Sequence, residues 1–273
     1  MIGALIGDVI GSVFEWHNVK TTDFPLFSGE SKFTDDTVMT IAVADTLLCK
    51  QMYRSDLKNS VESRTFYTAK FKQYGHRYPD AGYGTMFQAW LKSSNPKPYG
   101  SFGNGSAMRA SPIGFAFDTL KDVLKEAKRS AIVTHNHRDG IKGAQAVAAA
   151  VFLARSGESK VNIKHLLEGM FTYNLSRKLD EIRPTYMFDA SCKGSVPEAI
   201  IAFLDSEHFE DAIRKAISIG GDSDTIACIT GAIAQAYYKK IPADMIQNTL
   251  FRLDAGMKTI IKQFNERYKV ECE

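Results

Sequence analysis

The sequence predicts an all-α fold in a single domain over residues 1–273. Apolar residues recur at the spacing of a helix face along most of the chain. The alternation of apolar and polar residues that is typical of strands is nearly absent. Since no Pro- or Ser-rich linker and no internal repeat divides the chain, we expect about ten or more helices in a single domain.

The first predicted helix carries a stripe of glycines. Gly3, Gly7 and Gly11 are four residues apart and Glu15 continues this spacing, which places all of them on one helical face. Glycines on such a face allow another backbone to approach closely. The simplest interpretation is close helix packing with a surface glutamate, and Glu15 becomes a site candidate only together with the motifs below. Asp8 lies one residue off the stripe, and the pattern indicates no partner for it.

A pair of acids marks the start of the next predicted helix. Asp35 and Asp36 are flanked by Thr34 and Thr37 and precede an apolar series at helical spacing. A helix N-cap needs only one such acid, and adjacent acids repel each other unless a positive charge lies between them. Oxygen-rich clusters of this kind suit hard cations such as Mg²⁺ or Mn²⁺. Capping and cation binding both remain open at this point.

A loop rich in proline and glycine occupies residues 93–113. Loops of this length inside a compact domain are usually functional. Small polar residues and glycines at a predicted helix start present backbone N–H groups to anions such as a pyrophosphate, although a tight turn is the simpler interpretation. The residues concerned are Gly103, Asn104, Gly105 and Ser106.

Two helices are predicted around a pair of histidines. Apolar spacing predicts a helix over 120–131, and the alanine-rich residues 140–156 predict a buried helix that ends near Gly157. Between them, His135 and His137 are two residues apart and so lie on different faces of any helix. This excludes a helical zinc pair and leaves either a polar loop beside a pocket or an inert loop.

The acid-and-hydroxyl chemistry occurs a second time near the end of the chain. Ser195 followed three residues later by Glu198 is a helix-start signature, and a glycine pair predicts the end of a helix over 208–219. Asp222-Ser223-Asp224-Thr225 then opens another apolar helix. It is not an EF-hand loop, because the downstream ligands are missing. Two such clusters at helix starts fit a shared site for two divalent cations.

Composition excludes several classes of protein. Hydrophobic residues make up 44% and charged residues 24% of the chain, which is ordinary globular composition rather than disorder. The net charge of +3 is too small to indicate a nucleic-acid or membrane-surface partner. The longest apolar run, 146–154, is too short to span a bilayer. The four cysteines lack metal-binding spacing, so we expect reduced thiols in a cytoplasmic protein without a signal peptide.

Taken together, the motifs resemble those of the ADP-ribosylglycohydrolase family, which includes the hydrolase that reactivates dinitrogenase reductase. Five segments match in the family's order, from residue 3 to about residue 236. They are G-A-L-I-G-D-V-I-G-S-V-F-E, F-T-D-D-T-V-M-T, G-N-G-S-A-M-R-A-S-P-I-G, T-H-N-H-x-x-G-x-x-G-A and G-G-D-S-D-T-I-A. Each segment alone is weakly specific, whereas five in order are strongly so.

The resemblance implies an all-α fold, a single compact orthogonal multi-helix domain, that holds a binuclear centre of two Mg²⁺ or Mn²⁺ ions. By motif position, the metal ligands would be Thr34, Asp35, Asp36, Asp222, Asp224 and Thr225. Glu15 matches an acid that the family uses near the metals and, in some members, as the catalytic carboxylate. The positions that match the loop around the phosphates and ribose, and a pocket histidine, are Gly103, Asn104, Gly105, Ser106 and His135.

The resemblance also implies an activity. Family members hydrolyse the C1″ bond of ADP-ribose linked to arginine or serine side chains, to acetyl esters or within poly(ADP-ribose). We therefore expect a monomer that acts on an ADP-ribosylated protein or a small ADP-ribose conjugate, with Glu15, Asp35 or Asp36 as the catalytic acid or base. One alternative is an inactive ADP-ribose-binding or structural member of the family, which is disfavoured because all six expected metal ligands are present. The other is a two-metal phosphohydrolase, which is disfavoured because the sequence lacks its adjacent His-Asp pair and its Nudix-type glutamates.

Overall fold

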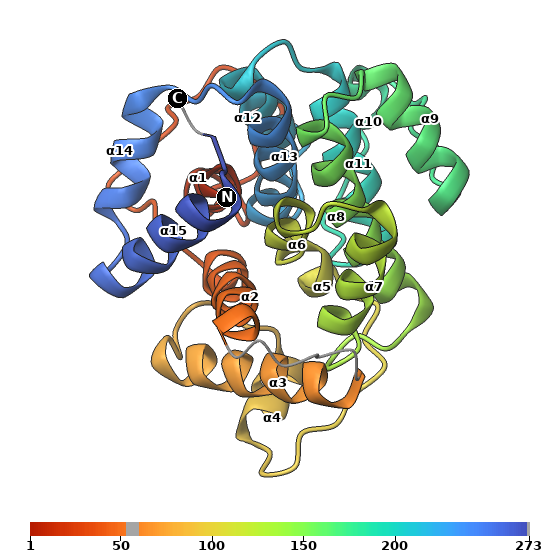
Figure 1. The fold of residues 1–273 in the computed structure, drawn as a ribbon. Helices are drawn as coiled ribbons and strands as arrows, with labels where there is room; N and C mark the ends of the chain where they lie inside the picture. Colours follow the sequence, from red (N-terminus) through yellow and green to blue (C-terminus); the bar gives the residue numbers. More distant parts are fainter. Residues whose placement is uncertain (53–59, 272–273) are drawn as a thin grey trace.

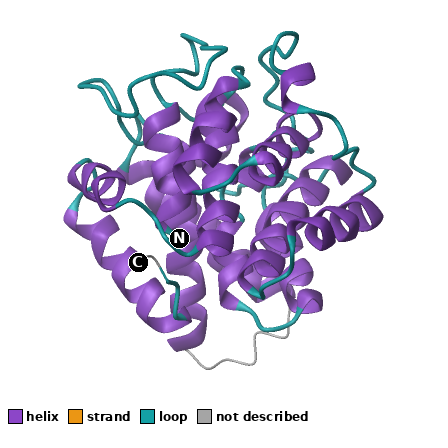
Figure 2. Cartoon of the chain, turned by 90° about the horizontal axis from the view of Figure 1, so that it is seen from above, coloured by secondary structure: helices purple, strands orange, loops and turns teal. Residues whose placement is uncertain are grey.

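The structure is a computed structural model that describes residues 1–52 and 60–271. These residues form helices and loops, and within them the strand pairing is limited to one isolated bridge between Gly103 and Ser191 (Figure 2). In chain order the helices are α1 (Ile2–Gly11), α2 (Asp35–Met52), α3 (Ser60–Arg77), α4 (Thr85–Lys92), α5 (Gly105–Met108), α6 (Ser111–Ala116), α7 (Leu120–Ala131), α8 (Arg138–Arg155), α9 (Lys160–Phe171), α10 (Leu179–Ile182), α11 (Cys192–Asp205), α12 (Phe209–Ser218), α13 (Ser223–Tyr238), α14 (Ala243–Phe251) and α15 (Ala255–Tyr268). The predicted all-α class is confirmed.

Helices α1 and α13 pack against each other at the centre of the molecule (Figure 1). Helix α13 also packs against α8, α11 and α12, while α2 packs against α3 and α15. The α-amino group of Met1 donates to the side chain of Asn265, which places the start of the chain beside α15. One hydrophobic core runs through these helices, and every residue of α1 is buried. Helix α1, which carries the glycine stripe, is therefore part of the core.

The glycine stripe performs the packing role that its spacing predicts. A Cβ atom on Gly3 would overlap the carbonyl of Gly231, and one on Gly7 would overlap the backbone of Ala227. A Cβ atom on Gly11 would lie 2.5 Å from the Cα atom of Asp224. The three glycines thus permit the backbones of α1 and α13 to touch along the length of α1.

The structure corrects two of the sequence-based boundaries. Helix α1 ends at Gly11, so Glu15 lies in the turn that follows rather than on the helix face. Helix α11 begins one turn before the predicted start, because Ser191, not Ser195, is its N-cap. The hydroxyl of Ser191 accepts from the N–H of Gly194, while the hydroxyl of Ser195 donates to the carbonyl of Ser191.

Other helices lie where the sequence predicts them. Helix α7 matches 120–131, α8 matches the alanine-rich segment, and α12 ends one residue before position 219. Gly220 and Gly221 follow α12 with φ of 76° and 72°, in the left-handed region that favours glycine. No helix of the described residues is long and apolar enough to cross a bilayer. The described cysteines, Cys49, Cys192 and Cys228, are free thiols, and Cys272 lies outside the described residues.

Candidate metal centre and active-site cavity

The two acidic helix starts open into one cavity of about 580 Å³. It is lined by every predicted metal ligand, by Glu15 and by part of the glycine-rich loop. The lining residues named by the sequence are Glu15, Thr34, Asp35, Asp36, Gly103, Asn104, Gly105, His135, Asp222, Asp224 and Thr225. Ser106 is the exception among the predicted site residues, because it is fully buried and its hydroxyl donates to the carbonyl of Gly140.

The start of α2 is held from behind by Asp8. One Asp8 oxygen accepts the hydroxyl of Thr34 at 2.6 Å. The other oxygen accepts the backbone N–H groups of Thr34 and Thr37 at 2.9 and 3.0 Å. Asp8 is fully buried, so the expectation that it has no partner is wrong. It satisfies backbone donors that would otherwise be unpaired at the helix start and fixes the position of Asp35 and Asp36.

The start of α13 is held mainly by backbone contacts and amide groups. Gly11 lets the chain at Asp224 press against α1. The side-chain oxygen of Asn18 accepts the N–H of Gly221 at 2.5 Å, and its NH₂ group donates to the carbonyls of Glu15 and Gly221. The NH₂ group of Asn104 donates to Asp222 at 2.8 Å. These contacts place Asp222 at the N-cap of α13 and Asp224 in its first turn.

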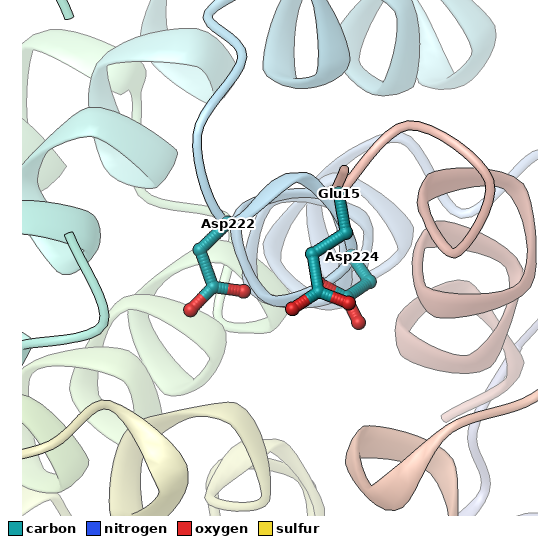
Figure 3. A group of neighbouring side chains, drawn as sticks. All are labelled: Glu15, Asp222 and Asp224. Carbon is teal, nitrogen blue, oxygen red and sulfur yellow. The ribbon is translucent and has the colours of Figure 1, made fainter. Parts of the chain in front are cut away.

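Glu15 joins the acids of α13 although it comes from the turn after α1. Ligand oxygens of Glu15, Asp222 and Asp224 all lie within 4.8 Å of one another, which is close enough to share one cation. In Figure 3 the three carboxylates gather at the start of α13. Glu15 is half-buried while both aspartates are buried, so Glu15 is the acid of this group with the most contact with solvent.

The two helix starts meet through Thr225 and Asp36. The hydroxyl of Thr225 donates to one oxygen of Asp36 at 3.1 Å. These residues are 189 positions apart in the chain, and this contact brings the two acid clusters into one site. The second oxygen of Asp36 is buried and has no hydrogen-bond partner.

The electrostatics of the cavity are those of crowded acids. Burial, followed by the charges of Asp222 and Asp8, raises the pKa of Glu15 to about 7. Burial, followed by the charges of Asp8 and Asp222, raises the pKa of Asp35 to about 8. The pKa values of Asp36 and Asp224 also rise well above their usual range, first through burial and then through neighbouring carboxylates. Each acid therefore disfavours the charge of the others.

These residues fit divalent cations. Carboxylate and hydroxyl oxygens are the ligands that Mg²⁺ and Mn²⁺ prefer. A buried carboxylate oxygen without a partner is costly, and coordination of a cation would satisfy the free oxygen of Asp36. Positive charge would also offset the mutual repulsion that raises the pKa of Asp35 and Glu15. The donor types thus suit a divalent cation. The carboxylates that lie close enough to share one are Glu15, Asp222 and Asp224, and Asp35 and Asp36 line the same cavity.

The glycine-rich loop differs in detail from its sequence-based interpretation. Helix α5 has only four residues, and the N–H groups of Gly103 and Asn104 already donate to Ser101 Oγ and to the carbonyl of Ala190. These two amides are therefore used inside the protein rather than offered to an anion. The loop contributes the Asn104 side chain and the close backbone of Gly105, whose missing Cβ would lie 3.4 Å from His135 Nε2.

His135 is a buried residue in the wall of the cavity. Its Nδ1 atom is hydrogen-bonded to the hydroxyl of Thr134 at 2.7 Å. Burial, followed by the charge of Arg109, lowers the pKa of His135 well below its usual value. Arg109 is itself fully buried, donates to Thr134 and lies over the ring of Phe71. His137, by contrast, accepts the N–H of Asp139 and caps α8, so the two histidines have separate roles.

Sequence reasoning missed three residues that support the site: Asp8, Asn18 and Lys20. Asp8 carried a readable signal, because a lone charge in an otherwise apolar, buried helix needs a partner. Lys20 donates to the carbonyls of Ile219 and Tyr186 at 2.6 and 2.8 Å. The partners of Asn18 and Lys20 are about 160 to 200 residues away, and no local pattern indicates them.

Fold and site together define an all-α protein with a cavity lined by carboxylate and hydroxyl groups. The family model for ADP-ribosylglycohydrolase matches residues 1–272. The chain belongs to the ADP-ribosylglycohydrolase family.

Curated relatives and a solved structure agree with this assignment. The chain is 31% identical over 313 aligned positions to the ADP-ribosylhydrolase ARH3 of Homo sapiens, with 87% of this chain and 84% of the relative covered. It is 26% identical to the ADP-ribosylarginine hydrolase Tri1 of Pseudomonas putida (strain GB-1), with 87% and 69% covered. A solved structure titled as an ADP-ribosylglycohydrolase-related protein complex shares the fold, with a TM-score of 0.69, 23% identity and coverage of 98% and 95%.

Proposed function

We propose that this protein is a metal-dependent hydrolase that cleaves the C1″ glycosidic bond of ADP-ribose conjugates and releases ADP-ribose. The observation that carries the proposal is the meeting of two acidic helix starts and Glu15 in one cavity, where a buried oxygen of Asp36 has no partner. Its relatives include an ADP-ribosylhydrolase and an ADP-ribosylarginine hydrolase, and this supports hydrolysis of an ADP-ribose conjugate.

The proposed cofactors are two Mg²⁺ ions, which Mn²⁺ can replace. When bound, the cations supply positive charge that binds the distal-ribose hydroxyls and acidifies a nearby water. The residues that would hold them are Thr34, Asp35, Asp36, Asp222, Asp224 and Thr225, with Glu15 close enough to Asp222 and Asp224 to assist.

The chain's own residues would divide the remaining work. Cleavage builds positive charge on the ribose ring as the C1″ bond breaks, and the crowded carboxylates stabilise that charge. Glu15 is the most solvent-accessible acid of its cluster. Its carboxylate takes a proton from the water whose oxygen bonds to C1″, and the proton passes to the leaving atom as the bond from C1″ to that atom breaks. The side chain of Asn104 and the wall formed by His135 and Gly105 orient the ADP-ribose part.

The direct test is incubation with arginine-linked and serine-linked ADP-ribosylated peptides in the presence of Mg²⁺, followed by detection of free ADP-ribose. We expect release by the wild type and its loss in Asp224→Asn. The matched control is Asp118→Asn, since the side chain of Asp118 is fully exposed and lies outside the cavity. Binding of ADP-ribose without release from any conjugate would contradict hydrolysis and favour the inactive, ADP-ribose-binding alternative.

A further inference from the structure

Exposed apolar side chains gather at one edge of the cavity. Trp16 and Phe188 stack with ring centroids 5.2 Å apart and an interplanar angle of 17°. Trp16 is 72% exposed, Phe188 46% and the neighbouring Met187 80%. We call Trp16, Met187 and Phe188 the aromatic rim. Trp16 and Phe188 also line the acid cavity, so the rim is part of its mouth.

The loops that carry the rim are anchored to each other. Lys20 bridges them, because its Nζ atom donates to the carbonyl of Tyr186, two residues before Phe188, and to that of Ile219. Asn18 ties the turn that carries Trp16 to Gly221. These contacts hold the backbones that carry the rim beside each other. Clustered exposed apolar side chains of this kind mark binding sites on soluble proteins.

A second cavity, of about 550 Å³, adjoins the first at Phe188. Phe188 lines both cavities, while Met187 lines the second. Arg177, Glu181 and Asp189 give the second cavity charges of both signs. Large apolar side chains beside a few polar groups are typical of surfaces that bind polypeptide. The second cavity thus continues the site outward from the acids.

We propose that the aromatic rim and the second cavity bind the polypeptide that flanks the modified side chain of an ADP-ribosylated protein. The inference rests on the proposed function, because it concerns the group released from C1″. In the proposed reaction this leaving group separates from C1″ beside Glu15, and Trp16 is the next residue of the chain. In a protein conjugate the group continues into a main chain, which must leave the cavity through its mouth. The apolar part of the mouth is the rim.

The test compares two substrates that differ only in the flanking chain. One is a short ADP-ribosylated peptide, and the other is the same ADP-ribosylated amino acid alone. In Phe188→Ala we expect KM for the peptide to rise about tenfold, the loss typical of an aromatic anchor. We expect KM for the single amino acid to stay within about twofold. Phe251→Ala is the matched control, because Phe251 is 84% exposed at the end of α14, away from the cavity.

Binding measurements keep the inference separate from the proposed function. In calorimetry with the slow Glu15→Gln variant, which does not consume the ligand during the titration, the ADP-ribosylated peptide should bind more tightly than free ADP-ribose does. Adding Trp16→Ala to that variant should remove the difference. Equal losses on the peptide and on the single amino acid would show that the rim contacts ADP-ribose itself, and would overturn the inference. Unchanged values on both would overturn it as well. If wild type releases nothing from either substrate, the proposed function fails, while the calorimetric comparison still decides the inference.

Discussion

The starts of α2 and α13 carry similar acid-and-hydroxyl sequences but are supported by different neighbours. At α2, the buried carboxylate of Asp8 accepts hydrogen bonds from Thr34 and Thr37. At α13, the support comes from the backbone of Gly11, which lies against Asp224, and from the amide side chain of Asn18. One start is thus fixed by a buried charge and the other by close packing and neutral donors.

The difference has an electrostatic reason. Asp8 adds a negative charge next to acids that already repel one another, and it raises the pKa of Asp35 and Asp36 further. The supports of α13 add no charge. The support of α2 therefore adds to the repulsion among the acids of the cavity, whereas the supports of α13 do not. Two helix starts with similar sequences are thus held in place by different kinds of contact.

The largest expected effect is on the side of α13. Glu15→Gln should lower kcat about 10²–10⁴-fold, the usual contribution of a positioned acid or base. ADP-ribose affinity should change little, because the other contacts of the ADP-ribose part remain. Turnover and calorimetry on the same preparations check both. An active Glu15→Gln variant would move the proton-handling role to Asp35 or Asp36, on the side of α2.

Close packing between α1 and α13 should make Gly7 intolerant of any side chain. In Gly7→Ala the new Cβ atom would overlap the backbone of Ala227, which cannot move independently of α13. We expect the free energy of unfolding to fall by about 3 kcal/mol, measured by denaturant titration. Gly169→Ala on α9 is the control, because nothing lies within 4 Å of its Cβ position. That variant should gain about 0.5–1 kcal/mol. A Gly7→Ala protein as stable as wild type would refute the packing account.

Removal of the charge at Asp8 should act on cation binding. Asp8→Asn keeps the shape of the side chain but loses one acceptor for the three donors at the start of α2. Changes of this kind behind metal ligands cost about 10–100-fold in metal affinity, so the Mg²⁺ concentration for half-maximal activity should rise by that factor. At saturating Mg²⁺, kcat should largely recover. An unchanged Mg²⁺ dependence would show that Asp8 supports only the fold.

The smallest effect is expected for Asn18. Asn18→Ala removes the hydrogen bonds that tie the turn of Glu15 to Gly221. We expect the lost hydrogen bonds to raise the activation free energy by about 1 kcal/mol, because they help to position Glu15. This corresponds to roughly a fivefold lower kcat, with KM nearly unchanged. The measurement is steady-state kinetics of Asn18→Ala. The control is Asn162→Ala, which changes an exposed asparagine on α9. A rise in KM with constant kcat would assign Asn18 to substrate binding instead.

Much of this fold could be predicted because its signals are local. Helical spacing located α7, α8 and α12, and the glycine stripe indicated a close backbone contact that α13 makes with α1. The convergence of the two acid clusters followed from their matching chemistry. In the structure the two clusters are in contact through the hydrogen bond from Thr225 to Asp36.

What the sequence could not predict depends on distant partners. Ser195 resembled a cap, but Ser191 took that role because its hydroxyl meets the free N–H of Gly194. The loop amides of Gly103 and Asn104 appeared free for an anion, yet Ser101 and Ala190 accept them. Each of these hydrogen bonds depends on which acceptor lies next to the N–H group in the folded chain. The spacing of residues along the sequence does not indicate that acceptor.

In the proposed function, both helix starts hold the cations that hydrolysis requires. The most direct measurement combines ADP-ribose release with Mn²⁺ content for wild type, Asp36→Asn and Asp224→Asn. We predict that EDTA abolishes release by wild type and that Mg²⁺ or Mn²⁺ restores it. Each variant should lose both bound Mn²⁺ and turnover, since one carboxylate comes from each helix start. Full turnover in excess chelator, by protein that elemental analysis shows to be free of metal, would contradict the claim.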